Sequence, residues 1–367
     1  MKDLSALSEV ELKAYKNKLQ LDISKYHNFQ LTKKIQLNSA YGAMGNEYFR
    51  FFDIRLAEAV TLSGQLVIKW IAKDVNKYLN TLLNTQSVEY VFYIDTDSIY
   101  ITLGDLVQKI YKNQPPTDKQ KITTALDKFC ESKLQGVIND SCNRLKDYLN
   151  CRTQKMQMKR ESIADKGIWT AKKRYILNVY DNEGVRYDSP KLKMQGIEAI
   201  KSSTPEICRD KIAEAIKIML NKKQDDLHNF IKKFKDEFSK LEPEDVAFPR
   251  GCNGISTYLD TAGSYKKGTP AHTKGAIIYN NLLVKKNLTK QYQTIQDGDK
   301  IKFVYLKQPN PTMDSVISII DVLPKEFNLH KYIDYDTQFE KSFIDPLKYI
   351  LNAVKWTVKK TASFADL

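Results

Sequence analysis

The stretch YVFYIDTDSIYIT, residues 90–102, constrains the fold of this chain more than any other feature. Two runs of β-branched and aromatic residues flank a segment that is long enough only for a tight turn, so the sequence predicts an antiparallel hairpin. The turn carries Asp95 and Asp97, where a half-buried hairpin normally has Gly, Asn or Pro. The two alternatives are a solvated acidic turn and a site that holds cations, and the apolar strands on both sides favour the second.

Two carboxylates this close repel each other unless cations lie between them, and Mg²⁺ favours such oxygen ligands together with substrate phosphate. Phosphoryl transfer with two metal ions uses such a pair to align the attacking and leaving oxygens. A calcium-binding EF-hand loop is excluded, because the sixth position from Asp95 is Tyr100 rather than glycine and the twelfth is Leu106 rather than glutamate.

A second candidate site lies in KKIQLNSAYG, residues 33–42. Lys34, Asn38 and Tyr41 stand at i, i+4 and i+7, so they share one stripe of a helix. A cation for phosphate, an amide for hydrogen bonds and an aromatic ring for stacking suit a nucleoside triphosphate lying along that stripe. The alternative is an ordinary solvated helix face.

Composition narrows the class of protein. The chain has 367 residues and a formal net charge of +14, which makes a polyanionic partner a reasonable expectation. Its five cysteines form no CxxC pair and its four histidines are scattered, so neither a disulfide framework nor a Cys/His zinc site is expected. A charged N-terminus and the lack of a long apolar run predict a cytoplasmic protein without a signal peptide or membrane span.

Periodicity predicts an α+β fold with an antiparallel sheet, packed helices and one long projecting helix. Ser8 and Glu11 form a capping-box signature at the start of that helix, and Thr204 with Pro205 marks the start of another. The expected helices span residues 8–40, 53–83 and 120–150, followed by two successive helices within 204–241 and a last helix over 336–360. The expected strands lie within 90–102, 154–197, 299–306 and 315–322, and residues 243–275 are expected to be loop.

The two motifs, in this order, resemble family B DNA polymerases. KKIQLNSAYG matches the fingers-helix pattern Lys-x-x-x-Asn-Ser-x-Tyr-Gly, and YIDTDS matches the palm pattern Tyr-x-Asp-Thr-Asp-Ser. KKRY, residues 172–175, looks like the element that contacts the primer end, and TLSGQ, residues 61–65, resembles the segment after the fingers helix. PKLKMQGIEAIKSSTP, PAHTKGAIIYN and DGDKIKFVYL look like the palm end and thumb of the enzymes from large tailed bacteriophages.

The resemblance implies template-directed addition of dNTPs to a primer 3′-hydroxyl with two Mg²⁺ ions, on primer–template DNA. The implied roles are metal binding and catalysis for Asp95 and Asp97 and metal binding for Glu161. Nucleotide binding is implied for Lys34, Asn38, Tyr41 and Gly42. Primer or DNA binding is implied for Lys172, Lys173, Arg174, Tyr175, Lys201, Ser202, Ser203 and Thr204. A purely structural role is the alternative for two of these residues. Glu161 could be a surface acid paired with Lys159 or Arg160, and Tyr175 could be a core residue.

The resemblance also implies a division into a fingers helix (1–43), a palm part (44–195) and a thumb with a tail (196–367). The family's pattern Asp-x-x-Ser-Leu-Tyr-Pro, which carries another palm aspartate, is absent from this sequence. We therefore expect the C-terminal part of a split polymerase, with a partner chain that supplies this aspartate through a large apolar interface. The tail KKTASFADL faintly resembles a sliding-clamp binding tail. The rival hypothesis is a non-catalytic remnant that grips duplex DNA.

Overall fold

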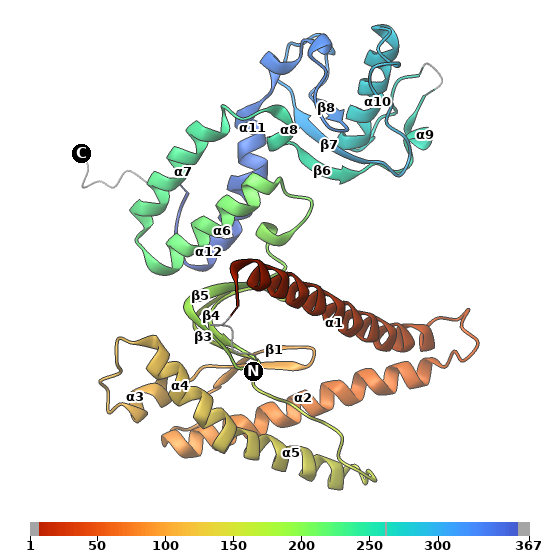
Figure 1. Cartoon of the computed structure of the whole chain (residues 1–367). Coiled ribbons are helices and arrows are strands. Elements are labelled where there is room, and N and C mark those ends of the chain that lie inside the picture. Colours follow the sequence, from red (N-terminus) through yellow and green to blue (C-terminus); the bar gives the residue numbers. More distant parts are fainter. Residues whose placement is uncertain (1–6, 261–262, 359–367) are drawn as a thin grey trace. The chain divides into compact units, whose positions relative to one another are not determined.

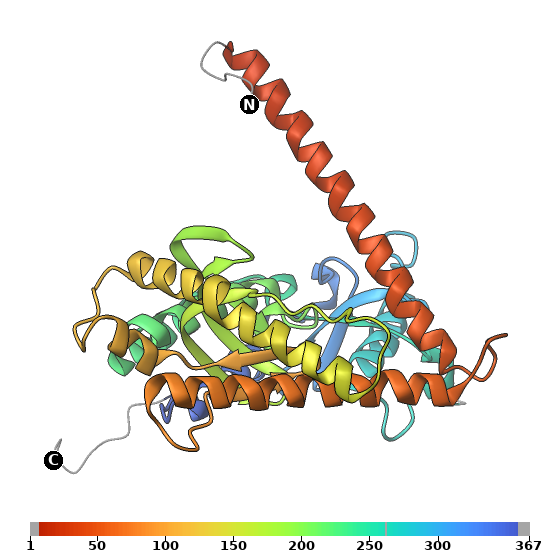
Figure 2. The ribbon, with the colours of Figure 1, turned by 90° about the horizontal axis from the view of Figure 1, so that it is seen from below.

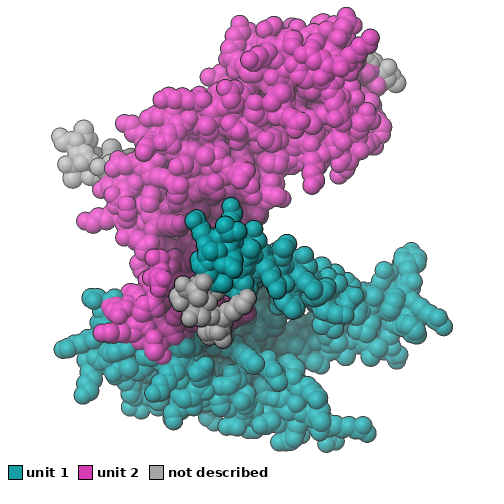
Figure 3. All heavy atoms as spheres, viewed as in Figure 1, with its two compact units in different colours: residues 1–117, 125–160 teal, residues 118–124, 161–367 magenta. Residues whose placement is uncertain are grey.

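The computed structural model describes residues 7–260 and 263–358. The fold is α+β with antiparallel sheets and one long helix, as predicted. Two compact units are present: unit 1 comprises residues 1–117 and 125–160, and unit 2 comprises residues 118–124 and 161–367 (Figure 3). This division differs from the division into fingers, palm and thumb, which stays a prediction. Among the described residues, no helix combines the length and apolarity needed to cross a bilayer.

Unit 1 begins with two long helices, α1 (Glu9–Met44) and α2 (Ile54–Leu83). The predicted capping box starts α1: the Ser8 hydroxyl accepts from the Glu11 backbone N–H, and the Glu11 carboxylate accepts from the Ser8 N–H at 2.9 Å. None of the residues of α1 is buried, which agrees with a helix that projects away from a core (Figure 2). The Asp53 side chain caps α2, and its backbone N–H donates to the Met44 carbonyl across the connection between the helices.

The core of unit 1 forms along the second half of α2. The hairpin β1 (Val91–Asp95) and β2 (Ser98–Ile101) packs there, together with α5 (Gln135–Tyr148). Apolar residues from Leu56 to Leu82 recur at three- and four-residue spacing, which predicts a core-facing stripe along the whole of α2. The stripe is buried only in the second half of the helix, and the prediction is wrong at its N-terminal end, where Leu56 and Val60 are 52% and 53% exposed. The other helical segments that lie wholly or partly in this unit are α3 (Gly104–Ile110), α4 (Lys119–Phe129) and a π-helical turn (Cys130–Leu134).

Unit 2 contains two three-stranded antiparallel sheets (Figure 1). The first has the order β3 (Ser162–Ala171), β4 (Arg174–Asn182), β5 (Val185–Gln195), with Tyr175 paired to Gln195. The second has the order β6 (Phe248–Gly251), β7 (Lys300–Tyr305), β8 (Val316–Ile319). The helices of this unit are α6 (Glu206–Asn221), α7 (Gln224–Phe238), α8 (Pro243–Val246), α9 (Ile255–Tyr258), α10 (Ala271–Lys285), α11 (Tyr335–Phe339) and α12 (Asp345–Ala353).

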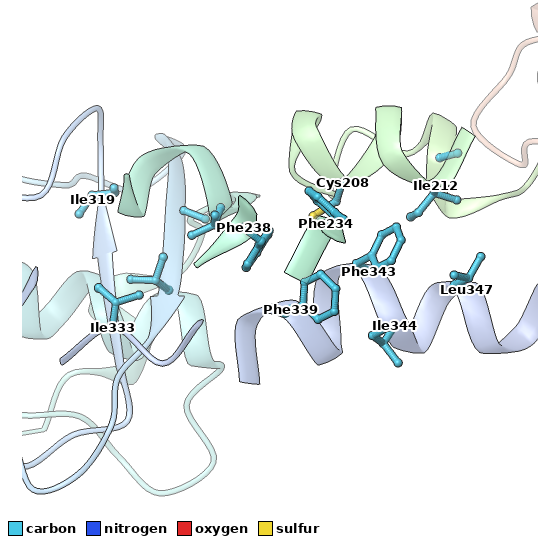
Figure 4. Packing of buried hydrophobic residues seen from close by; sticks show 14 of the residues in the cluster. Cys208, Ile212, Phe234, Phe238, Ile319, Ile333, Phe339, Phe343, Ile344 and Leu347 are labelled. Carbon is cyan, nitrogen blue, oxygen red and sulfur yellow. The ribbon is translucent and has the colours of Figure 1, made fainter. Parts of the chain in front are cut away.

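One continuous apolar core holds unit 2 together. Phe234 and Phe238 of α7 pack edge-on against Phe343 and Phe339 of the C-terminal helices (Figure 4). The expectation that residues 243–275 are loop is wrong in part. They include β6, which pairs with β7, and the first turn of α10, which packs on β8.

Candidate functional site

The predicted nucleotide-binding stripe lies on a helix, as expected. Lys34, Asn38, Tyr41 and Gly42 all fall within α1, and all four are exposed. A side-chain carbon added to Gly42 would meet no described atom within 4 Å beyond its chain neighbours and the backbone of its own helix. The whole stripe is therefore open to a ligand.

A hydrogen bond joins this stripe to the next helix. The Tyr41 hydroxyl lies 2.7 Å from Oγ1 of Thr61, which itself donates to the Ala57 carbonyl at 3.0 Å. Thr61 opens the segment TLSGQ, which the resemblance had singled out separately. The structure thus brings two of the predicted motifs into contact.

The acidic hairpin has a two-residue turn. Asp95 pairs with Ser98 in the strand register, and the Asp97 N–H donates to the Asp95 carbonyl at 2.7 Å. Thr96 adopts a φ of +56°, a left-handed conformation that β-branched residues avoid and that costs about 1–3 kcal/mol. Asp95 is half-buried and Asp97 is exposed. The turn that carries the two acids therefore holds its central threonine in a strained conformation.

Helix α2 positions the hairpin as well as the stripe. The Asn76 side chain accepts from the Val91 N–H at 2.8 Å, and Asn80 bonds to both backbone groups of Val88. The turn of the hairpin points along α2 toward its junction with α1 (Figures 1 and 2). At 1.5 Å per residue, Asn76 and Thr61 lie about 22 Å apart along the axis of α2. Strand β1 starts beside Asn76, and its five residues have a length of about 16 Å.

The donor set of the hairpin fits a magnesium ion that is shared with a substrate. Within residues 7–260 and 263–358, no group of three or more His, Cys, Asp or Glu side chains is placed to enclose a metal. Mg²⁺ is commonly held by one or two carboxylates together with substrate phosphates and water. Asp95 and Asp97 match that pattern, and they lack the ligands of a self-contained cage.

Glu161, the third predicted ligand, lies in unit 2, whereas both aspartates lie in unit 1. Its carboxylate accepts from the Lys193 ammonium at 2.5 Å. Lys193 is therefore one partner of this carboxylate, whereas the alternative reading had suggested Lys159 or Arg160. Arg160 pairs with Asp127 at 2.6 Å.

The predicted primer-binding turn connects β3 to β4. Lys172 and Lys173 are both exposed, and Lys173 has a left-handed φ of +61°. Tyr175 is buried at 7% exposure, and its ring stacks on Trp169 with centroids 6.1 Å apart. The two lysines thus face solvent, while the tyrosine belongs to the packing of the sheet.

The loop of residues 201–204 precedes α6. Ser202 is exposed and Thr204 is buried at 6% exposure. The expected cap is wrong, because the N-cap of α6 is Pro205 and Thr204 stands one residue earlier. The Arg250 guanidinium donates to the Ser203 carbonyl at 2.7 Å and so ties this loop to β6.

Glu198 is a residue of this region that sequence reasoning missed. Its Oε1 accepts from the Arg174 guanidinium and from the Lys201 ammonium, the latter at 3.0 Å. This carboxylate therefore bridges two segments that were predicted separately. The spacing of Glu198 and Lys201 at i, i+3 was a visible signal, but the contact with Arg174 depends on the pairing of β4 and β5.

Comparison with known sequences covers both the helix stripe and the acidic hairpin. The sequence profile described as DNA polymerase family B matches residues 10–125, which include the stripe and the acidic hairpin. The DNA-directed DNA polymerase of Escherichia phage RB69 is 36% identical over 352 residues, covering 92% of this chain and 38% of the relative. The enzyme of Enterobacteria phage T4 is 33% identical over 346 residues, covering 91% and 38%. DNA polymerase 1 of Aeropyrum pernix is 24% identical over 261 residues, covering 70% and 22%.

The class defined by the profile is DNA polymerase family B. The chain belongs to this family, and its similarity to the two phage enzymes identifies it as the phage type. It spans 38% of the length of each of these two relatives.

Proposed function

We propose that this chain supplies part of a DNA-directed DNA polymerase that extends a primer 3′-hydroxyl with dNTPs during DNA replication. The observation that carries the proposal is the attachment of two motifs to one helix. The Thr61 side chain of α2 contacts the nucleotide-binding stripe, and Asn76 and Asn80 of α2 hold the acidic hairpin. A nucleotide gripped by the stripe would then have its phosphates directed toward the carboxylates.

Asp95 and Asp97 are the proposed ligands of two Mg²⁺ ions, which would supply charge neutralisation at the phosphates and activation of the primer hydroxyl. Lys34 would pair with the triphosphate, Asn38 would donate a hydrogen bond, and Tyr41 would stack against the sugar or base. Gly42 would allow the nascent base pair to approach the helix, because no described side chain fills the space beside it. Glu161 would need to exchange Lys193 for a metal ion to act as a further ligand.

Primer–template DNA is the proposed polyanionic partner. The exposed Lys172 and Lys173, with Ser202 of the loop before α6, form the edge that we assign to the primer. Lysine reaching the minor groove would meet acceptors common to all base pairs, so it would read geometry rather than sequence. The net charge of +14 supports such a partner. Tyr175 would support this edge through packing.

Polymerase segments outside this sequence are the proposed source of the remaining palm aspartate, whether they lie on a longer form of the chain or on a partner chain. Large apolar side chains on α1 and α2 support an extensive contact with such segments, because a surface of this kind is unusual for a free protein. The exposed residues include Leu19, Leu21, Ile23, Leu37, Leu56, Val60 and Leu62. A sliding clamp remains a predicted partner for residues 359–367, which lie outside the described residues.

The test is primer extension by the assembled polymerase, with this chain combined with the remaining polymerase segments. Asp97→Asn should reduce extension by at least about 100-fold, because it removes a ligand charge where transition-state charge must be stabilised. Binding of primer–template DNA should change less than about 2-fold. Glu89→Gln is the matched control, since Glu89 is an exposed acid just before the same hairpin and should leave extension unchanged. Near-normal extension by Asp97→Asn with intact DNA binding would favour a non-catalytic DNA-gripping remnant.

A further inference from the structure

Glu198 joins two cations of the DNA-facing edge at a single oxygen. Its side chain is 18% exposed, whereas those of its partners Arg174 and Lys201 are 31% and 46% exposed. Its second oxygen, Oε2, is buried without a hydrogen-bond partner among the described residues. The carboxylate therefore faces inward while both cations remain near the surface.

The backbone around Gly196 fixes this arrangement. Gly196 has a φ of +65°, and a side-chain carbon there would lie 2.6 Å from the Lys173 carbonyl oxygen. The Arg174 guanidinium also donates to the Gly196 carbonyl at 3.1 Å. The turn of residues 172–174 and the segment of residues 196–201 are thus locked together, with no room for either to slide.

The electrostatic balance keeps the bridge ionised. Burial alone would raise the pKa of Glu198, but the hydrogen bond from Lys201 and the charges of Arg174 and Lys201 outweigh burial and hold the pKa below its usual value. At neutral pH one anion therefore offsets part of the charge of two cations. Lys172, two residues before Arg174, is exposed and has no carboxylate among its described contacts.

We propose that Glu198 is a positioning residue that withholds Arg174 and Lys201 from the DNA backbone and leaves phosphate contact to Lys172. This inference rests on the proposed DNA-binding function and refines it, because it removes two cations from the predicted contact set. Glu198 thereby limits the sequence-independent grip on the duplex, so that the polymerase can move along it.

The test measures how the affinity of the full chain for a fluorescein-labelled primer–template duplex depends on salt, by anisotropy between about 50 and about 200 mM KCl. Each phosphate contact adds about 0.9 to the slope of log affinity against log salt. Glu198→Gln keeps the shape of the side chain and removes its charge, so it should steepen the slope by about 0.9–1.8. Over this salt range it should lose about 3- to 12-fold more affinity than the unaltered chain.

Asp336→Asn is the matched control, because it removes the same charge from another ion pair of unit 2, with Lys235 at 2.8 Å. Its slope should stay within about 0.3 of the unaltered value. Glu198→Asp retains the charge, so its slope should also stay within about 0.3 of the unaltered value. If Glu198→Gln and Asp336→Asn shift the slope equally, the effect is one of net charge and the proposal is overturned.

Lys201→Gln provides an independent arm that keeps Glu198 and its bond to Arg174. Since Lys201 is already paired, its loss should leave the slope unchanged, and a slope shallower by about 0.9 would overturn the proposal even if Glu198→Gln fails to fold. If the affinity of the unaltered chain for DNA depends on salt but Glu198→Gln leaves the slope unchanged, only the role of Glu198 is overturned. An unaltered chain without salt-dependent binding overturns DNA binding as well.

Discussion

Replacing Gly275 with alanine should force helix α10 away from strand β8. An added side-chain carbon would lie 2.6 Å from both the backbone nitrogen and the hydroxyl of Ser318, and 2.9 Å from the carbonyl carbon of Ile317. Ordinary contact begins at 3.4 Å, so the two elements would have to separate by about 0.8 Å. Ser318 cannot relieve the clash cheaply, because it is fully buried and its hydroxyl donates to the His272 carbonyl at 2.7 Å.

The expected loss of stability is about 2 kcal/mol. Overpacking against backbone costs about 3 kcal/mol, the upper part of the usual range, and the better helix propensity of alanine returns about 1 kcal/mol. In a unit of about 200 residues this lowers Tm by about 4–8 °C. Gly64→Ala in α2 is the control with the opposite sign, since its added carbon would meet nothing within 4 Å. It should stabilise unit 1 by about 0.8–1 kcal/mol.

The assay is urea denaturation followed by far-UV circular dichroism, with hydrogen exchange assigning each change to a unit. Gly275→Ala should lose protection in α10 and β8, while peptides from α2 should be unaffected. The reasoning fails if Gly275→Ala is as stable as the unaltered chain. It also fails if both alanine variants shift stability in the same direction, because the sign is set by the space beside each glycine.

Three further experiments probe other parts of the chain: the removal of a core side chain, the reactivity of thiols in the native state, and acid titration. Leu79→Ala should destabilise unit 1 by about 2–5 kcal/mol in urea denaturation, because Leu79 is fully buried in the core beside the hairpin. Iodoacetamide at pH 8 should modify the exposed Cys151 and spare Cys208 until the protein unfolds, because burial raises the pKa of the Cys208 thiol to about 12. Mass spectrometry of tryptic peptides measures the extent of modification at each cysteine. The lowered pKa of Glu198 stabilises the fold above the ordinary value of 4.5, and this contribution disappears as pH falls through the folded pKa. Glu198→Gln should remove that part of the decline in Tm as pH falls below the ordinary value of 4.5.

Local signals account for the features that sequence reasoning predicted correctly. The capping box of Ser8 and Glu11 lies within one helical turn, and the hairpin at Asp95 is defined by strands that adjoin its turn. The spacing of the helix stripe needs only the helical period. Features of this kind depend on neighbours in sequence, so no knowledge of tertiary packing was required.

Elements that depend on distant partners were predicted poorly. The segment that begins α10 carries Gly275 and follows a region rich in Gly and Pro, so it was expected to be loop. Its glycine weakens a helix in isolation, and the close approach to β8 explains why glycine is needed there. The stripe of α2 gave the opposite error, since Leu56 has the spacing of a core residue but is 52% exposed.

The bridge at Glu198 shows where sequence reasoning about the site ends. Lys201 lies one turn away in sequence, but Arg174 reaches Glu198 only because β4 pairs with β5 so that Tyr175 lies opposite Gln195. A slip of one residue in that register would move Gly196 by about 3.3 Å relative to the Lys173 carbonyl. It would also move every side chain of the strand to the other face of the sheet. The set of cations that our proposal leaves to DNA therefore depends on strand register, and the composition of KKRY alone does not define it.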